Sequence, residues 1–140
     1  VAVADWHPNV GGSASDAYYT AFRARFPAAA DDYLFLRMPL MVEMLAQAME
    51  KARSADPTAV ARALEGMKLN KGFQTMEMRA ADHQLIQPLY VMEMDKAGTP
   101  GVPGVRFDNE GSGFGFRTLL KIPAAQTAMP TTCQMKRPVS

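Results

Sequence analysis

Residues 56–94 constrain the fold most, because a helix with start and stop signals is followed there by two strand-like runs. Asp56 can cap the helix, since its carboxylate can accept a hydrogen bond from an orphan backbone N–H, and the proline after it suits the first helical position. Gly66 is placed to end this helix. Residues 73–79 then alternate as a strand does, and residues 85–94 form a second strand after a polar turn. This order of elements favours an α/β fold.

Length and composition exclude several classes of protein. The 140 residues leave room for one domain at most, and a hydrophobic content of 48% is enough for a packed core. The formal net charge is +1 with both signs interspersed, so the chain lacks the clustered basic face expected of a nucleic-acid binder. Neither a signal peptide nor an apolar run near the roughly 20 residues that span a bilayer is found in the sequence.

The remaining segments add two helices and two strands. The first four residues predict a short strand, and Ser13 or Ser15 is expected to cap the helix that follows it. A longer helix is predicted to run to about Arg53, and residues 114–122 are predicted to form a final strand. The tail from Ala124 is expected to be extended and held by contacts.

The longer helix carries an apolar stripe with many methionines. Such a stripe could line a promiscuous binding groove, but methionine at helical spacing normally fills gaps in a core. We therefore predict that the stripe is buried. Its members are Leu40, Met41, Met44, Leu45, Ala48, Met49 and Ala52.

These segments together resemble the C-terminal region of one family. That family is the branched-chain amino-acid type of periplasmic substrate-binding protein, which delivers small molecules to an ABC importer. Its members carry a helix, a strand with a turn, and a second strand with characteristic residues. The matching positions are Asp56, Pro57, Val60, Ala63, Leu64, Glu65 and Gly66; Gly72, Met78, Arg79, Asp82, His83 and Gln84; and Gln87, Pro88, Tyr90 and Val91.

The resemblance implies a type I, two-lobed, Rossmann-like α/β fold, of which this chain would hold three helices and about five strands. Residues 1–140 would be the C-terminal portion of such a protein, contributing to both lobes, with hinge strands near residues 1–8 and 84–94. The implied location is the periplasm, with the signal peptide outside this chain. The implied partners are a small-molecule ligand, the membrane subunits of an ABC transporter, and the missing N-terminal part of the same protein or a second copy.

Residues 82–84 form the most polar local cluster and allow two interpretations. As a turn, Asp82 would accept a hydrogen bond from a neighbouring N–H and His83 would bridge strands. The resemblance implies a hinge role instead, in which Asp82, His83 and Gln84 hold the crossover strands in register. A metal site is not predicted, because the only other histidine is His7 and no His-x-x-x-His spacing is present.

Two aromatic residues are the candidates for ligand contact. In the family an aromatic residue before the long helix lines the cleft, and Tyr33 falls there, although a half-buried core tyrosine is an equally good interpretation. Trp6 lies in the crossover, in a "WHP" that relatives share. The family's "G-Y-D-A" is Leu36-Arg37-Met38-Pro39 here. That departure points away from an ordinary branched-chain ligand, and relatives with "WHP" and "DHQ" include binders of aromatic acids.

No catalytic motif is recognised, and we predict neither an enzyme nor a cofactor. The glycine-rich run from Gly111 to Gly115 precedes a strand, whereas a phosphate-binding loop precedes a helix. The single cysteine, Cys133, is a free thiol in this chain; the resemblance implies a disulfide to an earlier cysteine outside it. A self-contained sensor or interaction domain remains the alternative to a solute-binding protein.

Overall fold

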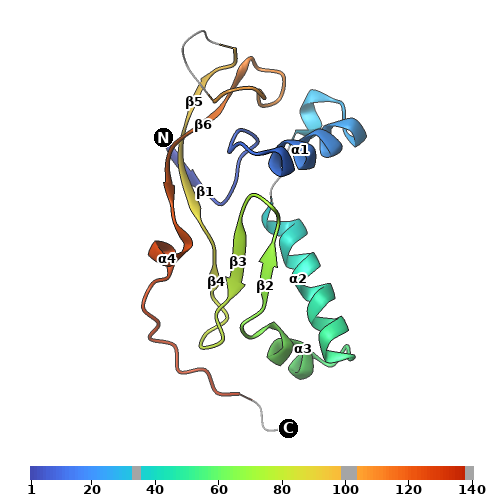
Figure 1. Ribbon diagram of the computed structural model, residues 1–140. Helices are drawn as coiled ribbons and strands as arrows, with labels where there is room; N and C mark the ends of the chain where they lie inside the picture. Colours follow the sequence, from blue (N-terminus) through green and yellow to red (C-terminus); the bar gives the residue numbers. More distant parts are fainter. Residues whose placement is uncertain (33–35, 99–103, 138–140) are drawn as a thin grey trace.

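The computed structural model describes residues 1–32, 36–98 and 104–137 (Figure 1). The α/β fold and the three predicted helices are confirmed. Within the described ranges the elements are β1 (Ala2–Ala4), α1 (Ser13–Arg25), the 3₁₀-helix η1 (Ala29–Asp31), α2 (Arg37–Ala52), α3 (Pro57–Leu64), β2 (Lys68–Asn70), β3 (Thr75–Met78), β4 (Leu85–Ile86), β5 (Leu89–Lys96), β6 (Phe114–Ile122) and α4 (Ala124–Thr127).

The strands form two separate antiparallel sheets of three strands each, in the orders β1-β5-β6 and β2-β3-β4. Figure 1 shows the long β5–β6 pair along one side of the molecule, with β2, β3 and β4 between it and α2. Helix α1 lies beside the upper sheet in this view, and α3 packs against α2 below. The molecule is therefore divided into two sheet-centred halves.

The predicted strand over residues 85–94 is divided into two strands. Its first part is β4, which pairs with β3, and its second part is β5, which pairs with β1 and β6. Gln87 and Pro88 separate them. A proline has no N–H to donate to a ladder, so the pairing stops there and the chain passes from one sheet to the other.

Helix α2 buries only one side of its apolar stripe. Leu40, Met44 and Ala48 are at most 2% exposed and belong to the hydrophobic core. Met41 and Leu45 are 54% and 48% exposed, so the prediction that the whole stripe is buried was wrong. In the part of the chain that the structure describes, nothing covers this second side.

The helix termini agree with the sequence in α3 but not in α1. Asp56 caps α3, because its Oδ1 accepts from the N–H of Ala59 at 2.9 Å, and Gly66 follows the helix with φ of 70°. Helix α1 has Gly12 as its cap, without a side-chain hydrogen bond. Ser15 is fully buried and its hydroxyl accepts from the Trp6 indole instead, so the predicted serine cap was wrong.

Three elements were not predicted, one of which is the 3₁₀-helix η1. Strand β2 has only three residues, of which Leu69 alone is buried, and so short a segment shows no readable alternation. Helix α4 is a single turn after Pro123. Among the described residues, no helix is both long enough and apolar enough to cross a bilayer.

Candidate functional site

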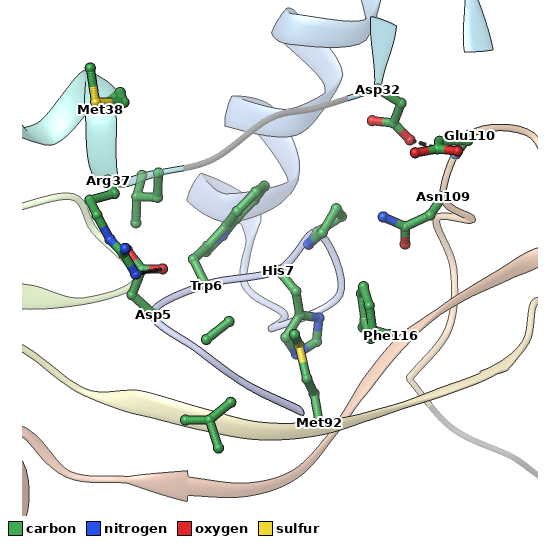
Figure 2. Close-up of a pocket in the computed structure, with 14 residues that line it drawn as sticks. Asp5, Trp6, His7, Asp32, Arg37, Met38, Met92, Asn109, Glu110 and Phe116 are labelled. Atoms are coloured by element: carbon green, nitrogen blue, oxygen red, sulfur yellow. Dashed lines mark hydrogen bonds and ion pairs between the residues drawn. The ribbon is translucent and has the colours of Figure 1, made fainter. Parts of the chain in front are cut away.

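A cavity of about 670 Å³ lies where the two halves meet (Figure 2). Its walls come from residues 3–8, which are the end of β1 and the segment after it, and from Arg37 and Met38 at the start of α2. The third wall is residues 109–110, and Met92 of β5 and Phe116 of β6 contribute further side chains. Most of the lining is apolar, as in typical small-molecule sites.

Asn9 joins the two loops that support this cavity. Its Oδ1 accepts from the N–H groups of Arg106 and Phe107, both at 2.8 Å, and its Nδ2 donates to the carbonyl of Phe107 at 2.7 Å. The Asn9 amide thus makes the hydrogen bonds that a neighbouring strand would otherwise make with residues 106 and 107. Gly115 must be glycine here, because a Cβ would lie 2.3 Å from the Phe107 carbonyl oxygen.

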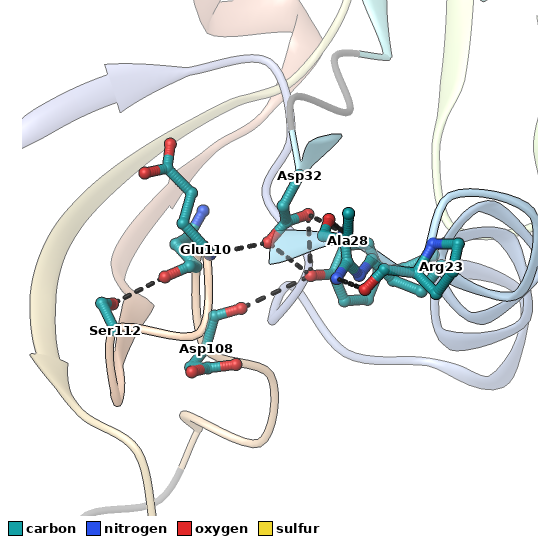
Figure 3. A network of polar contacts seen from close by, with 9 residues as sticks. Arg23, Ala28, Asp32, Asp108, Glu110 and Ser112 are labelled. Carbon is teal, nitrogen blue, oxygen red and sulfur yellow. Dashed lines mark hydrogen bonds and ion pairs between the residues drawn. The ribbon is translucent and has the colours of Figure 1, made fainter. Parts of the chain in front are cut away.

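Asp32 lines the cavity and is the centre of a network of polar contacts (Figure 3). The Tyr19 hydroxyl donates to its carboxylate at 2.9 Å, and the N–H of Glu110 donates to it at 2.9 Å. Nη1 of Arg23 lies 3.9 Å from Oδ1 of Asp32. Burial and the hydrogen bond to Asp32 raise the pKa of Tyr19. These contacts tie the loop around Glu110 to α1.

His7 is neutral, and both of its ring nitrogens are hydrogen-bonded. Its Nδ1 accepts from the N–H of Asn9 at 3.2 Å, which assigns the proton to Nε2, and Nε2 donates to the Thr118 hydroxyl at 2.9 Å. Burial lowers the pKa of His7 to about 4. Because both nitrogens are occupied, the imidazole contributes its ring to the cavity wall and offers no free donor or acceptor.

Asp5 and Arg37 lie together on one side of the cavity (Figure 2). Asp5 is 8% exposed, and its Oδ1 is 3.7 Å from Nη2 of Arg37. The other oxygen, Oδ2, is buried and has no hydrogen-bond partner among the described residues. Asn109 Oδ1, on the opposite side, is likewise without one. Buried polar groups are nearly always paired, so these two acceptors are exceptions in the cavity wall.

The sequence was compared with known protein families and the fold with solved structures. Residues 1–99 match the family described as periplasmic binding protein. The chain belongs to that family. No curated protein matches the sequence significantly.

Solved structures of periplasmic binding proteins share the fold. The leucine-, isoleucine-, valine-, threonine- and alanine-binding protein from Brucella ovis, in its closed conformation, aligns with a TM-score of 0.75 and 20% identity over 97% of this chain and 34% of that chain. A periplasmic binding protein from Burkholderia mallei aligns with a TM-score of 0.63 and 22% identity over 93% and 31% of the two chains. This periplasmic binding protein therefore spans about a third of the length of the structures it matches.

A third similar structure was solved with an aromatic ligand. It is a solute-binding protein of an ABC transporter from Rhodopseudomonas palustris BisB5 in complex with 3,4-dihydroxybenzoic acid. Its TM-score is 0.61 at 13% identity, over 87% of this chain and 30% of that chain. The resemblance to a part of a type I periplasmic binding protein is confirmed, and its family consists of solute-binding proteins.

In this periplasmic binding protein, Trp6 lies in the cavity wall. It is 5% exposed, its Nε1 donates to Ser15 at 3.0 Å, and its ring packs edge-on against Tyr18. Its contact with a ligand stays a prediction.

Tyr33 lies outside the described residues. Sequence reasoning missed that Asp5 and Arg37 line the cavity, because burial of a carboxylate leaves no local signal; the departure from the family at residues 36–39 was the one available clue.

Residues 82–84 form a turn in which the Asp82 carboxylate is paired. Arg79 donates to both oxygens of Asp82, at 2.8 and 2.5 Å, and the N–H of Gln84 donates to Asp82 at 3.2 Å. The Arg79 hydrogen bonds hold the pKa of Asp82 well below its usual range. The predicted acceptance by Asp82 is confirmed. His83 does not bridge strands: its Nε2 lies 3.5 Å from Glu65 Oε1, beyond α3, without forming a hydrogen bond. The hinge role of Asp82, His83 and Gln84 stays a prediction.

The C-terminal tail is held against this turn, as expected. Arg79 donates to the carbonyl of Met129 at 2.7 Å, and Arg137 donates to Glu65 at 2.8 Å and to the carbonyl of Ala80 at 2.7 Å. Cys133 in the tail is exposed, and its disulfide stays a prediction. The residues described contain no group of three potential metal ligands.

Proposed function

We propose that the chain is part of the extracytoplasmic solute-binding component of an ABC importer, and that it holds a small carboxylic acid in the cavity at Asp5, Trp6 and Arg37. The observation that carries this proposal is the cavity itself, since its walls come from the β1-β5-β6 sheet with its loops and from the start of α2. Ligands of two-lobed α/β proteins bind in such crevices. The location would be the periplasm.

The identity of the acid is open between two classes. A branched-chain amino acid is supported by the ligands named for the Brucella ovis protein. An aromatic acid is supported by the 3,4-dihydroxybenzoic acid complex and by the Trp6 and Phe116 rings in the cavity wall. Arg37, at the position where the family motif departs, suits the carboxylate of either class.

The mechanism would be hinge closure. The two sheets would belong to two lobes, with residues 1–8 and 84–94 as hinge strands, and β4 passes to β5 at Gln87 and Pro88. A ligand that contacts both lobes favours the closed state by its differential affinity for that state. The membrane subunits of the importer would recognise the closed form. Binding and release, without a chemical step, would be the whole activity.

The exposed side of α2 would be covered by the remaining part of the same protein. Met38, Met41, Val42 and Leu45 are 48% to 63% exposed and line an apolar groove with Leu85 and other residues. Soluble monomers rarely expose a contiguous apolar surface of this kind. A second copy of the chain is the competing occupant, as a self-contained interaction domain would require.

The test uses the protein at its natural full length. Leucine and 3,4-dihydroxybenzoate are titrated into it by calorimetry, and its melting is followed with each acid present. At a ligand concentration 100 times Kd, the free energy of unfolding should rise by about 2.7 kcal/mol. The acid should be recovered unchanged. Absence of binding across a panel of small carboxylates, or turnover of a bound one, would contradict the proposal.

A further inference from the structure

We propose that residues 123–137, which we call the strap, hold the two sheet-centred halves in the arrangement that forms the cavity, and so raise the affinity for a ligand that the strap does not touch. This rests on the proposed function, because it names a segment that regulates the same site. The strap follows the end of β6 at Ile122 and contains the single turn α4.

The strap begins in one half of the molecule and ends in the other. It leaves β6, which is an edge strand of the β1-β5-β6 sheet. Figure 1 shows it passing through α4 and then running beside the turn between β3 and β4 towards the lower end of the molecule. The chain also passes between the halves from β4 to β5, at Gln87 and Pro88. The strap is therefore a further crossing beside that one.

Thr127 fixes the start of the strap to the β4–β5 crossing. Its hydroxyl donates to the carbonyl of Gln87 at 2.7 Å, with the carbonyl of Ala124 at 2.8 Å as the alternative acceptor. Helix α4, which ends at Thr127, also contacts β4. Hinges are a few residues between elements that absorb changes of φ and ψ. A hydrogen bond to Gln87 therefore restrains the peptide group at which the angle between the halves would change.

The rest of the strap is held by the lower half. Three of its residues contact the turn at residues 79–84 or Glu65, which follows α3. These contacts are Arg79 with the Met129 carbonyl at 2.7 Å, Thr131 with the Asp82 carboxylate, and Arg137 with Glu65 at 2.8 Å and with the Ala80 carbonyl at 2.7 Å. The strap thus connects β6 to the β2-β3-β4 half at several points.

The strap is attached at the surface and can be released. Residues 128–134 and 136–137 are exposed, and the contacts that hold them are polar. Segments with few buried apolar contacts open locally at a small cost in free energy, without unfolding of the domain. Both sheets therefore stay folded when the strap detaches, and only the restraint between them is lost.

The strap acts on ligand binding through the arrangement of the halves. None of residues 123–137 lines the cavity. The contacts of the strap and the cavity are present in the same arrangement, so these contacts raise the fraction of molecules that adopt it. The apparent affinity for a ligand falls in proportion to the fraction of the protein in the binding-competent state. Release of the strap therefore weakens binding without removing a ligand contact.

The experiment uses the full-length protein with Cys133→Ser as the parent, so that the strap is held only by its non-covalent contacts. Calorimetry measures the binding of leucine or 3,4-dihydroxybenzoate, whichever the parent binds more tightly. A chain that ends at Ala128 should bind that acid at least about 3-fold more weakly, because several hydrogen bonds that favour the competent arrangement are lost. Thr127→Val should weaken binding in the same direction, and Thr20→Val, at an exposed position of α1, is the matched control and should bind as the parent does.

A second measurement reports the arrangement directly. Nitroxide labels are placed on Glu50→Cys in α2 and Met94→Cys in β5, both exposed positions, in a background without other cysteines. Electron–electron double resonance then gives the distribution of distances between the halves. Without ligand, the chain that ends at Ala128 should show a broader distribution than the parent, and saturating ligand should restore the distribution of the parent. Circular dichroism melting verifies that each variant is folded.

Two results overturn the inference while the proposed function survives. One is a folded chain ending at Ala128 that binds the acid as tightly as the parent does. The other is a ligand-free distance distribution that is the same in the shortened chain and the parent. If no small carboxylic acid binds to the parent, the proposed function fails and the effect on affinity fails with it.

Discussion

The cavity wall and the turn at residues 79–84 each hold a carboxylate, but the two carboxylates differ in how fully they are hydrogen-bonded. In the turn, Arg79 saturates Asp82 with hydrogen bonds and reaches the tail at Met129. In the cavity wall, Asp5 and Asn109 each retain a buried acceptor without a partner in the described chain. The paired carboxylate of Asp82 stabilises a local structure, whereas an unpaired buried acceptor such as that of Asp5 costs stability. The more prominent polar motif in the sequence is therefore the one that stabilises local structure.

The largest expected effect concerns the support of the cavity wall. Asn9→Ala removes three hydrogen bonds and leaves partly buried groups at Arg106 and Phe107 unpaired. The free energy of unfolding should fall by about 2–4 kcal/mol, measured by urea denaturation. Asn70→Ala is the matched control, because Asn70 makes one exposed hydrogen bond, to the N–H of Gly72, and should cost less than about 1 kcal/mol. Equal losses in the two variants would contradict the clamp assigned to Asn9.

The next largest effect is a dependence of stability on pH, which arises from His7 in the cavity wall. The pKa of His7 is lowered to about 4 in the folded protein, against about 6.5 when unfolded. Between these values the unfolded state binds the additional proton, so stability should fall as pH decreases from about 6.5 to 4, by on the order of 2 kcal/mol. Urea unfolding across this range measures it. His7→Gln should flatten the slope, and an unchanged slope in that variant would assign it to other groups.

The stability that the turn at residues 79–84 contributes should change over a different pH range. The pKa of Asp82 is lowered by its hydrogen bonds to Arg79, so its stabilisation is complete above about pH 4, the unfolded value, and is lost as pH falls below it. Asp82→Asn should therefore alter the unfolding curve at pH 3 relative to wild type while leaving the slope between pH 6.5 and 4 intact. A change confined to the higher window would show that the two regions are not separable.

The smallest effect is expected at the tail. Arg137→Gln removes the contacts with Glu65 and the carbonyl of Ala80, both of which are on the surface. Limited proteolysis should cleave residues 128–137 faster, while the urea midpoint of the remaining protein stays the same. Lys121→Gln, at an exposed position of β6 whose ammonium lies over the Tyr90 ring, is the control and should leave tail cleavage unchanged. A large drop in the midpoint would mean that the tail belongs to the core.

Much of the fold could be predicted because its signals are local. The Asp56 cap and the glycine at 66 gave the bounds of α3, and the alternation after residue 73 gave β3. The assignment of β4 and β5 to different sheets could not be predicted, since strand pairing depends on residues far apart in the sequence. The exposed side of α2 was misassigned for a related reason. An apolar stripe indicates that a helix face is to be buried, but it does not indicate which segment covers that face.

The candidate site could be predicted only in part. The "WHP" segment led to Trp6, whereas the role of Asp5 depends on its burial and on Arg37, which approaches it only in the folded chain. Tyr33 could not be assessed, since it lies outside the described residues. Pairings of this kind arise from tertiary structure, and no spacing in the sequence encodes them.

A crystal structure of the full-length protein with its tightest-binding small carboxylic acid tests the central claim most directly. The account predicts that the acid lies in the cavity between the β1-β5-β6 sheet and the start of α2, with its carboxylate within hydrogen-bond distance of Arg37 and its apolar part against Trp6. An acid bound elsewhere, with Arg37 facing solvent and the cavity empty, would contradict it.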